Sequence, residues 1–318
     1  MSTTTTTHAV PPSIDAQGWR PVAPELPLDD PRFVVAAGVG AAQMPRPVHE
    51  ALVSFADHGH RSGALLLRDV DFGNIPATPP TPTSRTTKDA TSEFALLTVA
   101  RRMGQPVGYE PEHGGRIVQN IVPTKENADR QVSTSSAVSL MFHTETAFHP
   151  HRPRYLLLAC LRGDASAATT LASVHEIAAE IPADVLATLA EPRFRTAVDA
   201  SFLNGRQNVL GPARPILTGT RDEPTFVFDA DLMVGTDDEA DAAVRLVNDT
   251  IERIHTSVVL EAGDLLVVDN NVAVHGRTPY APRFDGTDRW LQRTFVVADL
   301  APSATDRRGR VITTRFGV

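Results

Sequence analysis

The stretch at residues 142–149, Phe142-His143-Thr144-Glu145-Thr146-Ala147-Phe148-His149, decides which fold the sequence predicts. Alternate residues of an extended chain point to the same face, so the side chains of His143 and Glu145 can hold one ion together. A further histidine, His275, would complete a set of two imidazoles and one carboxylate. This set holds non-haem Fe(II) on one side and leaves other positions of the metal open. The sequence therefore predicts an iron site made of His143, Glu145 and His275.

Two arginines follow the second histidine. Arg289 comes 14 residues after His275, beyond a proline-rich segment with an Asp-Gly pair at 278–286. Such a segment is typical of a connecting turn, so we expect the chain to return antiparallel with Arg289 near the metal. Arg293 would share the inward face of this returning strand. A guanidinium can bind a carboxylate through two parallel hydrogen bonds, and a buried charge without a partner is costly. We therefore expect anionic partners for both arginines.

At these residues the sequence resembles the clavaminate synthase-like branch of the Fe(II)/2-oxoglutarate-dependent oxygenases, and within it the free L-amino-acid β-hydroxylases, such as viomycin-pathway arginine hydroxylase and asparagine oxygenase. This branch uses Glu as the carboxylate ligand, as Glu145 would be here. The resemblance implies a mainly β fold with helical flanks (α+β), a double-stranded β-helix or jelly roll. It spans about 114–297 and includes Val118-Gln119-Asn120-Ile121-Val122-Pro123, Tyr155-Leu156-Leu157-Leu158-Ala159-Cys160, Ala168-Thr169-Thr170-Leu171, Phe228-Asp229-Ala230-Asp231-Leu232 and the segment from His275 to Arg293.

The resemblance also implies the cofactor, the co-substrate and the reaction. The enzyme would use Fe(II), 2-oxoglutarate and O2, with Arg289 on the distal carboxylate of 2-oxoglutarate. Thr170 would bind the same co-substrate through its hydroxyl, although Thr169 could exchange roles with it. The implied reaction is hydroxylation at the β-carbon of a free L-amino acid in peptide-antibiotic metabolism. Desaturation and ring closure stay open as alternatives.

Asp229 and Asp231 give the best clue to the substrate. The sequence predicts a strand over 225–231 with both carboxylates on one face, where they repel each other unless a cation lies between them or one is protonated. A guanidinium or ammonium group would be such a cation, and the resemblance places a basic substrate side chain here. We therefore predict a basic amino acid, arginine first and then lysine.

Four other residues are assigned to the amino-acid substrate by the resemblance. Arg293 would bind its α-carboxylate or assist 2-oxoglutarate, and Glu145 would orient its α-amino group while also binding iron. Gln119 and Ser133 match the region that contacts the head group of the amino acid. Asparagine, citrulline or a carrier-bound amino acid stay open as substrates.

His149 and His151 allow a different metal site. With His143 and Glu145 they form the pattern H-x-E-x3-H-x-H, which could hold zinc in a protein that is not an oxygenase. A closed zinc site of this kind leaves His275 and the two arginines unexplained. We favour the iron site and expect His149 to pack beside it.

Composition limits the partners and the setting of the protein. The chain has 318 residues, of which 42% are hydrophobic, enough for a sizeable core. Its net charge of -8, without a basic run, argues against nucleic acid or an anionic membrane as partner. Cys160 is the one cysteine, so no internal disulfide forms, and no apolar run approaches the roughly 20 residues that span a bilayer. We expect a cytoplasmic enzyme, with a homodimer left open.

The domain organisation follows from local composition. Residues 1–30, with a threonine run and scattered prolines, predict a flexible tail or arm, and 31–318 predict one jelly-roll domain. The long segment 201–223 predicts a lid, because so long a loop in a compact domain is usually functional. Apolar periodicity and breakers predict helices at 46–58, 92–103, 175–180, 183–189 and 239–258, and strands at 63–70, 115–123, 155–162 and 168–173.

Overall fold

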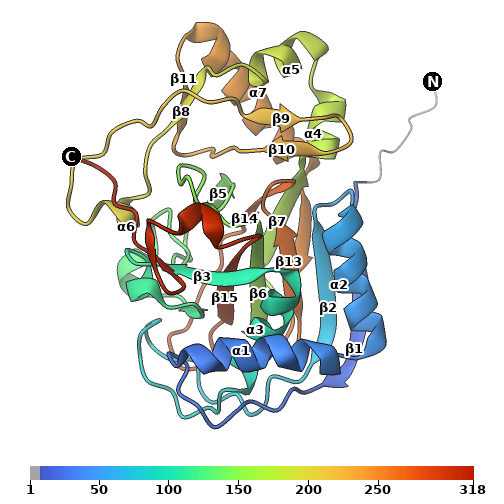
Figure 1. Ribbon diagram of the computed structural model, residues 1–318. Helices are drawn as coiled ribbons and strands as arrows, with labels where there is room; N and C mark the ends of the chain where they lie inside the picture. The colour runs from blue at the N-terminus through green and yellow to red at the C-terminus, as the bar shows by residue number, and fades with distance from the viewer. Residues whose placement is uncertain (1–7) are drawn as a thin grey trace.

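A nine-stranded sheet and a four-stranded sheet form the centre of the computed structural model, which describes residues 8–318 (Figure 1). In order across it, the larger sheet contains β1 (Ser13–Trp19), β2 (Ala64–Val70), β13 (Leu265–Asp269), β6 (Tyr155–Arg162), β15 (Trp290–Val297), β3 (Gln105–Tyr109), β17 (Val311–Ile312) and β16 (Arg307–Arg308), with β4 (Gln119–Ile121) also paired to β15. The smaller sheet contains β12 (Thr256–Val259), β7 (Ala168–Ser173), β14 (Ala273–Arg277) and β5 (Leu140–His143).

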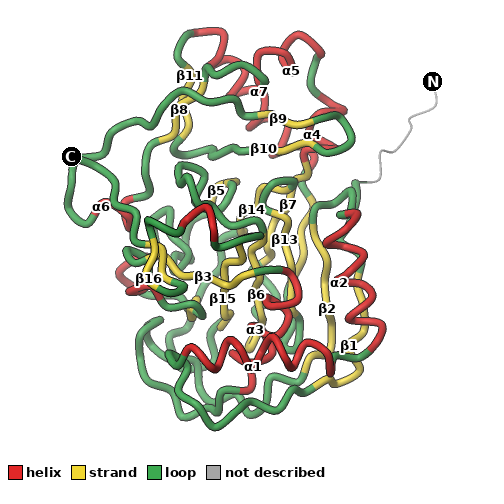
Figure 2. The backbone as a smooth tube through the Cα atoms, in the orientation of Figure 1, coloured by secondary structure: helices red, strands yellow, loops and turns green. Residues whose placement is uncertain are grey.

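Helices flank these sheets and cap one end of the molecule (Figure 2). The α-helices are α1 (Pro31–Gly40), α2 (Arg46–His58), α3 (Thr91–Met103), α4 (Val174–Glu180), α5 (Ala183–Leu189), α6 (Ala200–Leu203) and α7 (Asp238–Ile254). Short 3-10 helices occupy Ala41–Gln43, His113–Gly115, Lys125–Asn127 and Ala301–Ser303. There are also two small antiparallel sheets of two strands each. One pairs β8 (Phe194–Thr196) with β11 (Met233–Gly235), and the other pairs β9 (Leu217–Gly219) with β10 (Pro224–Phe226). The predicted mainly β architecture with helical flanks is confirmed.

Strand β6 explains how the core is divided. Successive side chains of a strand point to opposite faces, and all but the last residue of β6 are buried. Leu157 and Ala159 pack with α2 and α3 on one face, whereas Leu156 and Leu158 pack with Leu171 of the smaller sheet on the other. One continuous apolar run therefore serves two hydrophobic layers, and the second layer lies between the two sheets.

The elements with strong periodicity match their predictions closely. The segment predicted as a helix at 46–58 is α2, and that at 92–103 is α3. The helix predicted at 239–258 instead ends at Ile254, because Thr256–Val259 pairs with β7 as β12. None of the helices in residues 8–318 has the length and apolar character needed to cross a membrane.

The N-terminal prediction is wrong for Ser13–Trp19. This segment forms β1, which pairs in parallel with β2 and buries Ala16 completely. The segment has no alternation of apolar residues, and it joins the sheet through backbone hydrogen bonds that any sequence can make. The threonine run at residues 3–7 lies outside the described residues.

Candidate active site

A cavity of about 530 Å³ lies between the two sheets. Leu156, Leu158 and Leu291 line it from the larger sheet, and His275 and Thr169 line it from the smaller sheet. Most of the polar residues that the sequence singled out also reach this cavity. They are Ser133, His143, Glu145, Asp229, Asp231, Arg289 and Arg293.

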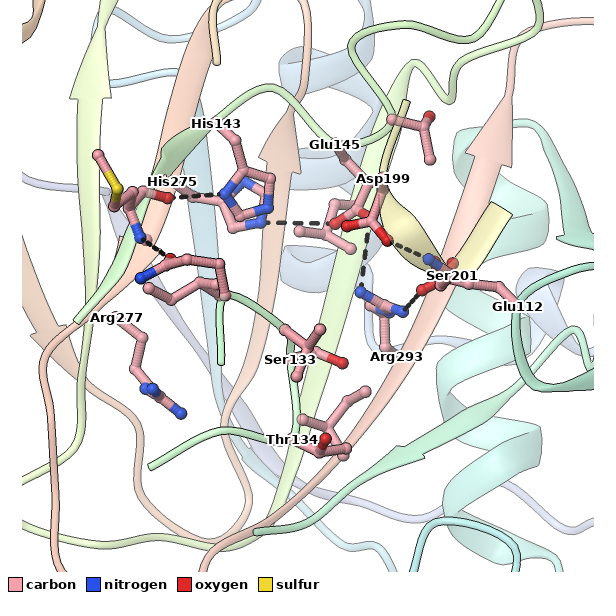
Figure 3. Close-up of a pocket in the computed structure, with 18 of the residues that line it drawn as sticks. Glu112, Ser133, Thr134, His143, Glu145, Asp199, Ser201, His275, Arg277 and Arg293 are labelled. Carbon is pink, nitrogen blue, oxygen red and sulfur yellow. Dashed lines mark hydrogen bonds and ion pairs between the residues drawn. The ribbon is translucent and has the colours of Figure 1, made fainter. Parts of the chain in front are cut away.

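Strand pairing brings the two predicted histidine ligands together. His143 ends β5 and pairs directly with His275 on β14, and their ring centroids lie 4.4 Å apart. Glu145 follows two residues later, and one ligand atom each from His143, Glu145 and His275 lie within 4.8 Å of one another (Figure 3). This is a spacing in which one ion can contact all three.

Hydrogen bonds with other residues fix the orientation of two of the three, His143 and Glu145. The Nδ1 of His143 donates to the carbonyl of Met141 at 2.8 Å, which leaves its Nε2 free for a metal. The side chain of Asn270 accepts from the backbone N–H of Glu145 at 2.7 Å and donates to its carbonyl at 3.1 Å. Sequence reasoning did not find Asn270, whose role depends on a contact 125 residues away along the chain.

The charge states of these residues suit a cation. Burial raises the pKa of Glu145, but the Arg293 guanidinium and the two imidazoles outweigh burial and lower the pKa to about 2. Burial, aided by His143, lowers the pKa of His275 to about 4. An ionised carboxylate and neutral imidazoles are the forms that bind a metal. Glu145 Oε2 is also buried without a hydrogen-bond donor among residues 8–318. The donor set therefore fits Fe(II).

Arg293 forms a buried network beside the metal ligands. Its Nη2 donates to Glu112 Oε1 and to Gln119 Oε1, each at 2.7 Å, and its Nη1 lies 3.5 Å from Glu145 Oε1. The carboxylates of Glu112 and Glu145 raise the pKa of Arg293 against the opposing effect of burial. Gln119 thus holds Arg293 rather than lining the cavity itself, and Glu112 is a site residue that the sequence analysis missed.

Arg289 immediately precedes β15 and has no carboxylate partner among residues 8–318. It is buried, and within residues 8–318 it takes part in no ion pair; Tyr280 lies beside it. Burial lowers the pKa of Arg289. Tyr280 also packs under the guanidinium of Arg277, 4.9 Å from the ring centroid. The structure therefore provides a buried cation that faces the cavity and can accept an anionic ligand.

Thr169 lines the cavity and Thr170 does not, which bears on the exchange of roles between these two residues that the sequence left open. Thr169 lies opposite Arg277 in the pairing of β7 with β14, and both line the cavity. Thr170 lies opposite Gly276, and its hydroxyl is 2.9 Å from where a Cβ of Gly276 would stand. Since paired residues of antiparallel strands share a face, the hydroxyl of Thr170 points away from the face of Thr169.

The predicted strand at 225–231 is wrong, although both of its aspartates reach the cavity. The strand ends at Phe226, Asp229 forms only an isolated bridge with His143, and Asp231 lies in a turn. The carboxylate of Asp229 accepts from the N–H groups of Asp231 and Leu232 at 3.0 and 2.9 Å. An aspartate that binds its own following backbone N–H groups makes a turn in place of a strand. Asp229 is buried, which raises its pKa, whereas Asp231 is exposed.

Of the segment 201–223, which the sequence predicts as a lid, the first residues line the cavity. Ser201 and Phe202 of α6 line the cavity, and so does Asp199, which caps this helix. Asp199 lies close enough to Arg293 and Glu112 for its charge to raise the pKa of each. Only an N-cap signal, Asp followed by a short helix, marks Asp199 in the sequence.

The alternative zinc site does not form. Within residues 8–318, His143, Glu145 and His275 are the one group of three or more possible ligands with converging atoms. His149 is turned towards Tyr109, with ring centroids 4.8 Å apart, and its Nδ1 accepts from the N–H of His151. His151 in turn pairs with Asp306.

Comparisons with known proteins find relatives that are named as dioxygenases, oxygenases, hydroxylases or clavaminate synthase. The family model described as taurine catabolism dioxygenase TauD, TfdA family matches residues 39–295. The chain is 40% identical to L-lysine 3-hydroxylase of Catenulispora acidiphila, over 89% of this chain and 81% of the relative. It is 36% identical to L-asparagine oxygenase of Streptomyces coelicolor, over 88% and 84% of the two chains. It is 32% identical to clavaminate synthase 2 of Streptomyces clavuligerus, over 91% and 88%.

Solved structures agree with these relatives. Asparagine oxygenase in complex with Fe(II), 2S,3S-3-hydroxyasparagine and succinate superposes with a TM-score of 0.84 and 33% identity, covering 94% of this chain and 92% of that one. The non-heme iron oxygenase OrfP in complex with Fe, succinate and (3S)-hydroxy-L-Arg gives a TM-score of 0.81 and 29% identity, covering 89% and 91%.

Proposed function

This chain belongs to the TauD, TfdA family of dioxygenases, and from that premise we propose that it hydroxylates a free basic L-amino acid. The chain is an enzyme of the Fe(II)-, 2-oxoglutarate- and O2-dependent type, with a jelly-roll fold, as the sequence predicted. Its relatives include hydroxylases of free amino acids. Beyond this class of enzyme, we propose that the side chain of the substrate is positively charged, and we propose which residues bind the substrate.

One observation carries the proposal of a basic side chain. Asp199, Asp229 and Asp231 all line the cavity, and no lysine or arginine within residues 8–318 forms an ion pair with any of them. Asp229 is buried, so its ionised form is costly without a nearby cation. An ammonium or guanidinium group at the end of the substrate side chain would supply that cation. Lysine and arginine are therefore the substrates that we place first.

The other end of the substrate would meet charges of both signs. Arg293 would bind the α-carboxylate, in keeping with the sequence prediction. Glu112 Oε2, buried without a hydrogen-bond partner among residues 8–318, would accept the α-ammonium group together with Glu145. An adjacent cation and anion complement the zwitterion of a free amino acid. A carrier-bound amino acid lacks the charged carboxylate, so this arrangement favours the free form.

The co-substrate would lie at the opposite side of the metal ligands. Arg289, which is buried and forms no ion pair within residues 8–318, would bind the distal carboxylate of 2-oxoglutarate, and we assign Thr169 as the hydroxyl partner of the same co-substrate. His143, Glu145 and His275 would hold Fe(II). When bound, Fe(II) would activate O2, the oxidant of the reaction, with one oxygen atom going to the substrate carbon and the other to 2-oxoglutarate, which gives up two electrons and is converted to succinate and CO2.

The protein's own part in the reaction is to position the substrate and to exclude water. The charged groups at the two ends of the amino acid fix which carbon faces the metal. Leu156, Leu158 and Leu291 form an apolar wall along the cavity. We assign the attack to the β-carbon, the position that the name of the lysine 3-hydroxylase relative gives for that enzyme. A cytoplasmic location, a homodimer and a place in peptide-antibiotic metabolism remain predictions from the sequence.

The test compares amino acids in one assay. Iron-loaded enzyme is incubated with 2-oxoglutarate and separately with L-lysine, L-arginine, L-ornithine, L-citrulline and L-asparagine, and succinate and a mass gain of one oxygen are measured. We expect turnover with lysine or arginine and little with citrulline or asparagine. In Asp229→Asn the KM for the basic amino acid should rise, with a smaller rise in Asp231→Asn because Asp231 is exposed. Turnover of asparagine or citrulline, but of no basic amino acid, would reject the proposal.

A further inference from the structure

The loop at 198–208 is closed into a compact unit that carries α6. Asn208 Oδ1 accepts from the N–H of Val198 at 3.0 Å, and Asn208 Nδ2 donates to the carbonyl of Val198 at 2.8 Å. One side chain thus joins both ends of the loop, as in a compact Ω-loop. The loop presents Asp199, Ser201 and Phe202 to the cavity.

A cluster of aromatic rings anchors this loop through Phe202. The ring of Phe202 is buried and lies edge-on to Phe148, at 5.0 Å between centroids, and close to Tyr109, at 5.7 Å. Phe148 is three residues beyond Glu145 and also lines the cavity. The position of the loop is therefore coupled by packing to the segment that carries a metal ligand.

The segment Phe316–Val318 holds the other side of the loop, and we call it the strap. The ring of Phe316 lies edge-on to Phe148 and His149, with centroids 5.2 and 5.1 Å away. The N–H of Gln207 donates to the carbonyl of Val318 at 3.2 Å, and the N–H of Val318 donates to the carbonyl of Gln207 at 3.3 Å. The strap thus pairs with the loop by backbone, and the C-terminal end of the chain lies beside the loop that carries α6 (Figure 1). By its side chain Phe316 joins the same aromatic cluster.

Close approach makes one glycine of the strap sensitive to substitution. Gly317 has φ +79°, and a Cβ added to it would stand 2.7 Å from the carbonyl oxygen of Gln207 and 2.9 Å from Cβ of Arg206. A side chain at Gly317 must therefore push the loop away or distort the strap. Gly309 has φ +59° with nothing within 4 Å of an added Cβ. The two glycines share the backbone requirement, but only Gly317 touches the loop.

We propose that the strap Phe316–Val318 is a positioning element that holds the loop 198–208, and with it Asp199, against the substrate end of the cavity. The strap touches no substrate and acts through Gln207 and through the aromatic cluster that contains Phe148 and Phe202. The inference rests on the proposed function, because it takes the end of the cavity near Arg293 and Glu112 as the amino-acid site. Arg289 and Thr169, which are assigned to 2-oxoglutarate, share no hydrogen bond or ion pair with the loop among residues 8–318, so we expect the strap to have little effect on the binding of 2-oxoglutarate.

Weakening the strap should therefore change the KM for the amino acid but not the KM for 2-oxoglutarate. In Phe316→Ala we expect the KM for the basic amino acid to rise about tenfold, which corresponds to about 1.4 kcal/mol, because the variant loses the ring contacts with Phe148 and His149 that hold the loop. The KM for 2-oxoglutarate should change less than about twofold, by the same scale. The ratio of succinate to hydroxylated product should increase, because a loosely held amino acid is hydroxylated less often per 2-oxoglutarate consumed.

Gly317→Ala, with Gly309→Ala as its matched control, gives the second test. Gly317→Ala should raise the KM of the amino acid as Phe316→Ala does, and Gly309→Ala should leave it unchanged. Hydrogen–deuterium exchange without any substrate should be faster in peptides covering 199–207 for Phe316→Ala and Gly317→Ala, but not for Gly309→Ala. If exchange in 199–207 is equally fast in the wild type, Phe316→Ala, Gly317→Ala and Gly309→Ala, the proposal that the strap holds the loop is wrong.

The exchange measurement keeps the two proposals distinguishable. If the wild-type enzyme converts no basic amino acid, the proposed substrate fails, and exchange in 199–207 still shows whether the strap holds the loop. A different result is that the wild type converts a basic amino acid and the variants exchange faster in 199–207, but their KM for the amino acid equals that of the wild type. In that case the strap holds the loop without positioning the substrate, and the inference is wrong.

Discussion

Replacing Arg293 by methionine should destabilise the metal-free protein by about 3–5 kcal/mol, the cost of removing one partner from a buried ion pair. The side chains of Arg293 and Glu145 are each 7% exposed, and that of Glu112 is 14% exposed. Methionine keeps the apolar stem of arginine but leaves two carboxylates without their shared cation. Gln119 also loses its donor from Arg293 Nη2 at 2.7 Å. The expected loss is therefore electrostatic and not a cavity effect.

A second substitution separates the charge from the packing. In Arg293→Met with Glu112→Leu, one of the two uncompensated carboxylates is gone, and an apolar pair replaces an ion pair. Such replacement is often neutral or stabilising. We expect the double variant to recover at least about 1 kcal/mol relative to Arg293→Met, a coupling within the usual range for residues in contact.

The assay is unfolding by urea in the presence of a chelator, with thermal unfolding alongside. For 318 residues, about 3–5 kcal/mol corresponds to a fall in Tm of roughly 4–8 °C at about 2.1 cal/mol/K per residue. Arg283→Met is the control, because Arg283 pairs with Asp285 on the surface at 3.4 Å with 69% of its side chain exposed. It should cost at most about 1 kcal/mol. A cost this small for Arg293→Met as well, or no recovery in the double variant, refutes the reasoning.

Three further predictions concern the co-substrate and pH. Thr169→Val should raise the KM for 2-oxoglutarate several-fold, whereas Thr170→Val should not; the opposite order would restore the original sequence assignment. Arg289→Lys should raise that KM by about tenfold or more, since one of two charge-assisted hydrogen bonds worth about 1.5–3 kcal/mol is lost, and an unchanged KM would remove Arg289 from the site. Burial lowers the pKa of His149 to about 3 from 6.5, so unfolded His149 binds a proton that folded His149 does not, and stability falls as the pH drops from 6.5 towards 3. Between pH 6.5 and 4.5, the free energy of unfolding measured with urea should therefore depend less steeply on pH in His149→Asn than in the wild type. The expected difference in slope is at most about 1.4 kcal/mol per pH unit, and identical slopes would contradict this.

The convergence of His143, Glu145 and His275 was predictable because their types and spacing form a recognisable pattern. The reason given for His143 and Glu145, alternation in an extended chain, applies only in part, since the strand ends at His143 and Glu145 reaches the same place from a turn. The position of Arg289 followed from the turn between it and His275. Continuous apolar runs likewise predicted β6, and Gly104 marked the end of α3.

The parts that sequence reasoning missed depend on contacts between distant segments. Glu112 has no pattern of its own and becomes a site residue only through Arg293, 181 positions away. The choice between Thr169 and Thr170 depends on a register that β14 sets. The strand expected at 225–231 failed because Asp229 binds the backbone N–H groups that follow it, a local competition that its apolar neighbours concealed.

The placement of site residues on different kinds of backbone has a consequence for protein engineering. His143, His275 and Thr169 sit on hydrogen-bonded strands of the smaller sheet, whereas Asp199, Asp229 and Asp231 sit on loops and turns. Grafting the segments around Asp199 and Asp231 from one homologue to another should exchange preference for the amino acid and leave the metal-binding residues in place, whereas Asp229 is bridged by its backbone to His143 and is best retained. Diversification of biocatalysts on this scaffold is therefore best directed at those connections rather than at the strands.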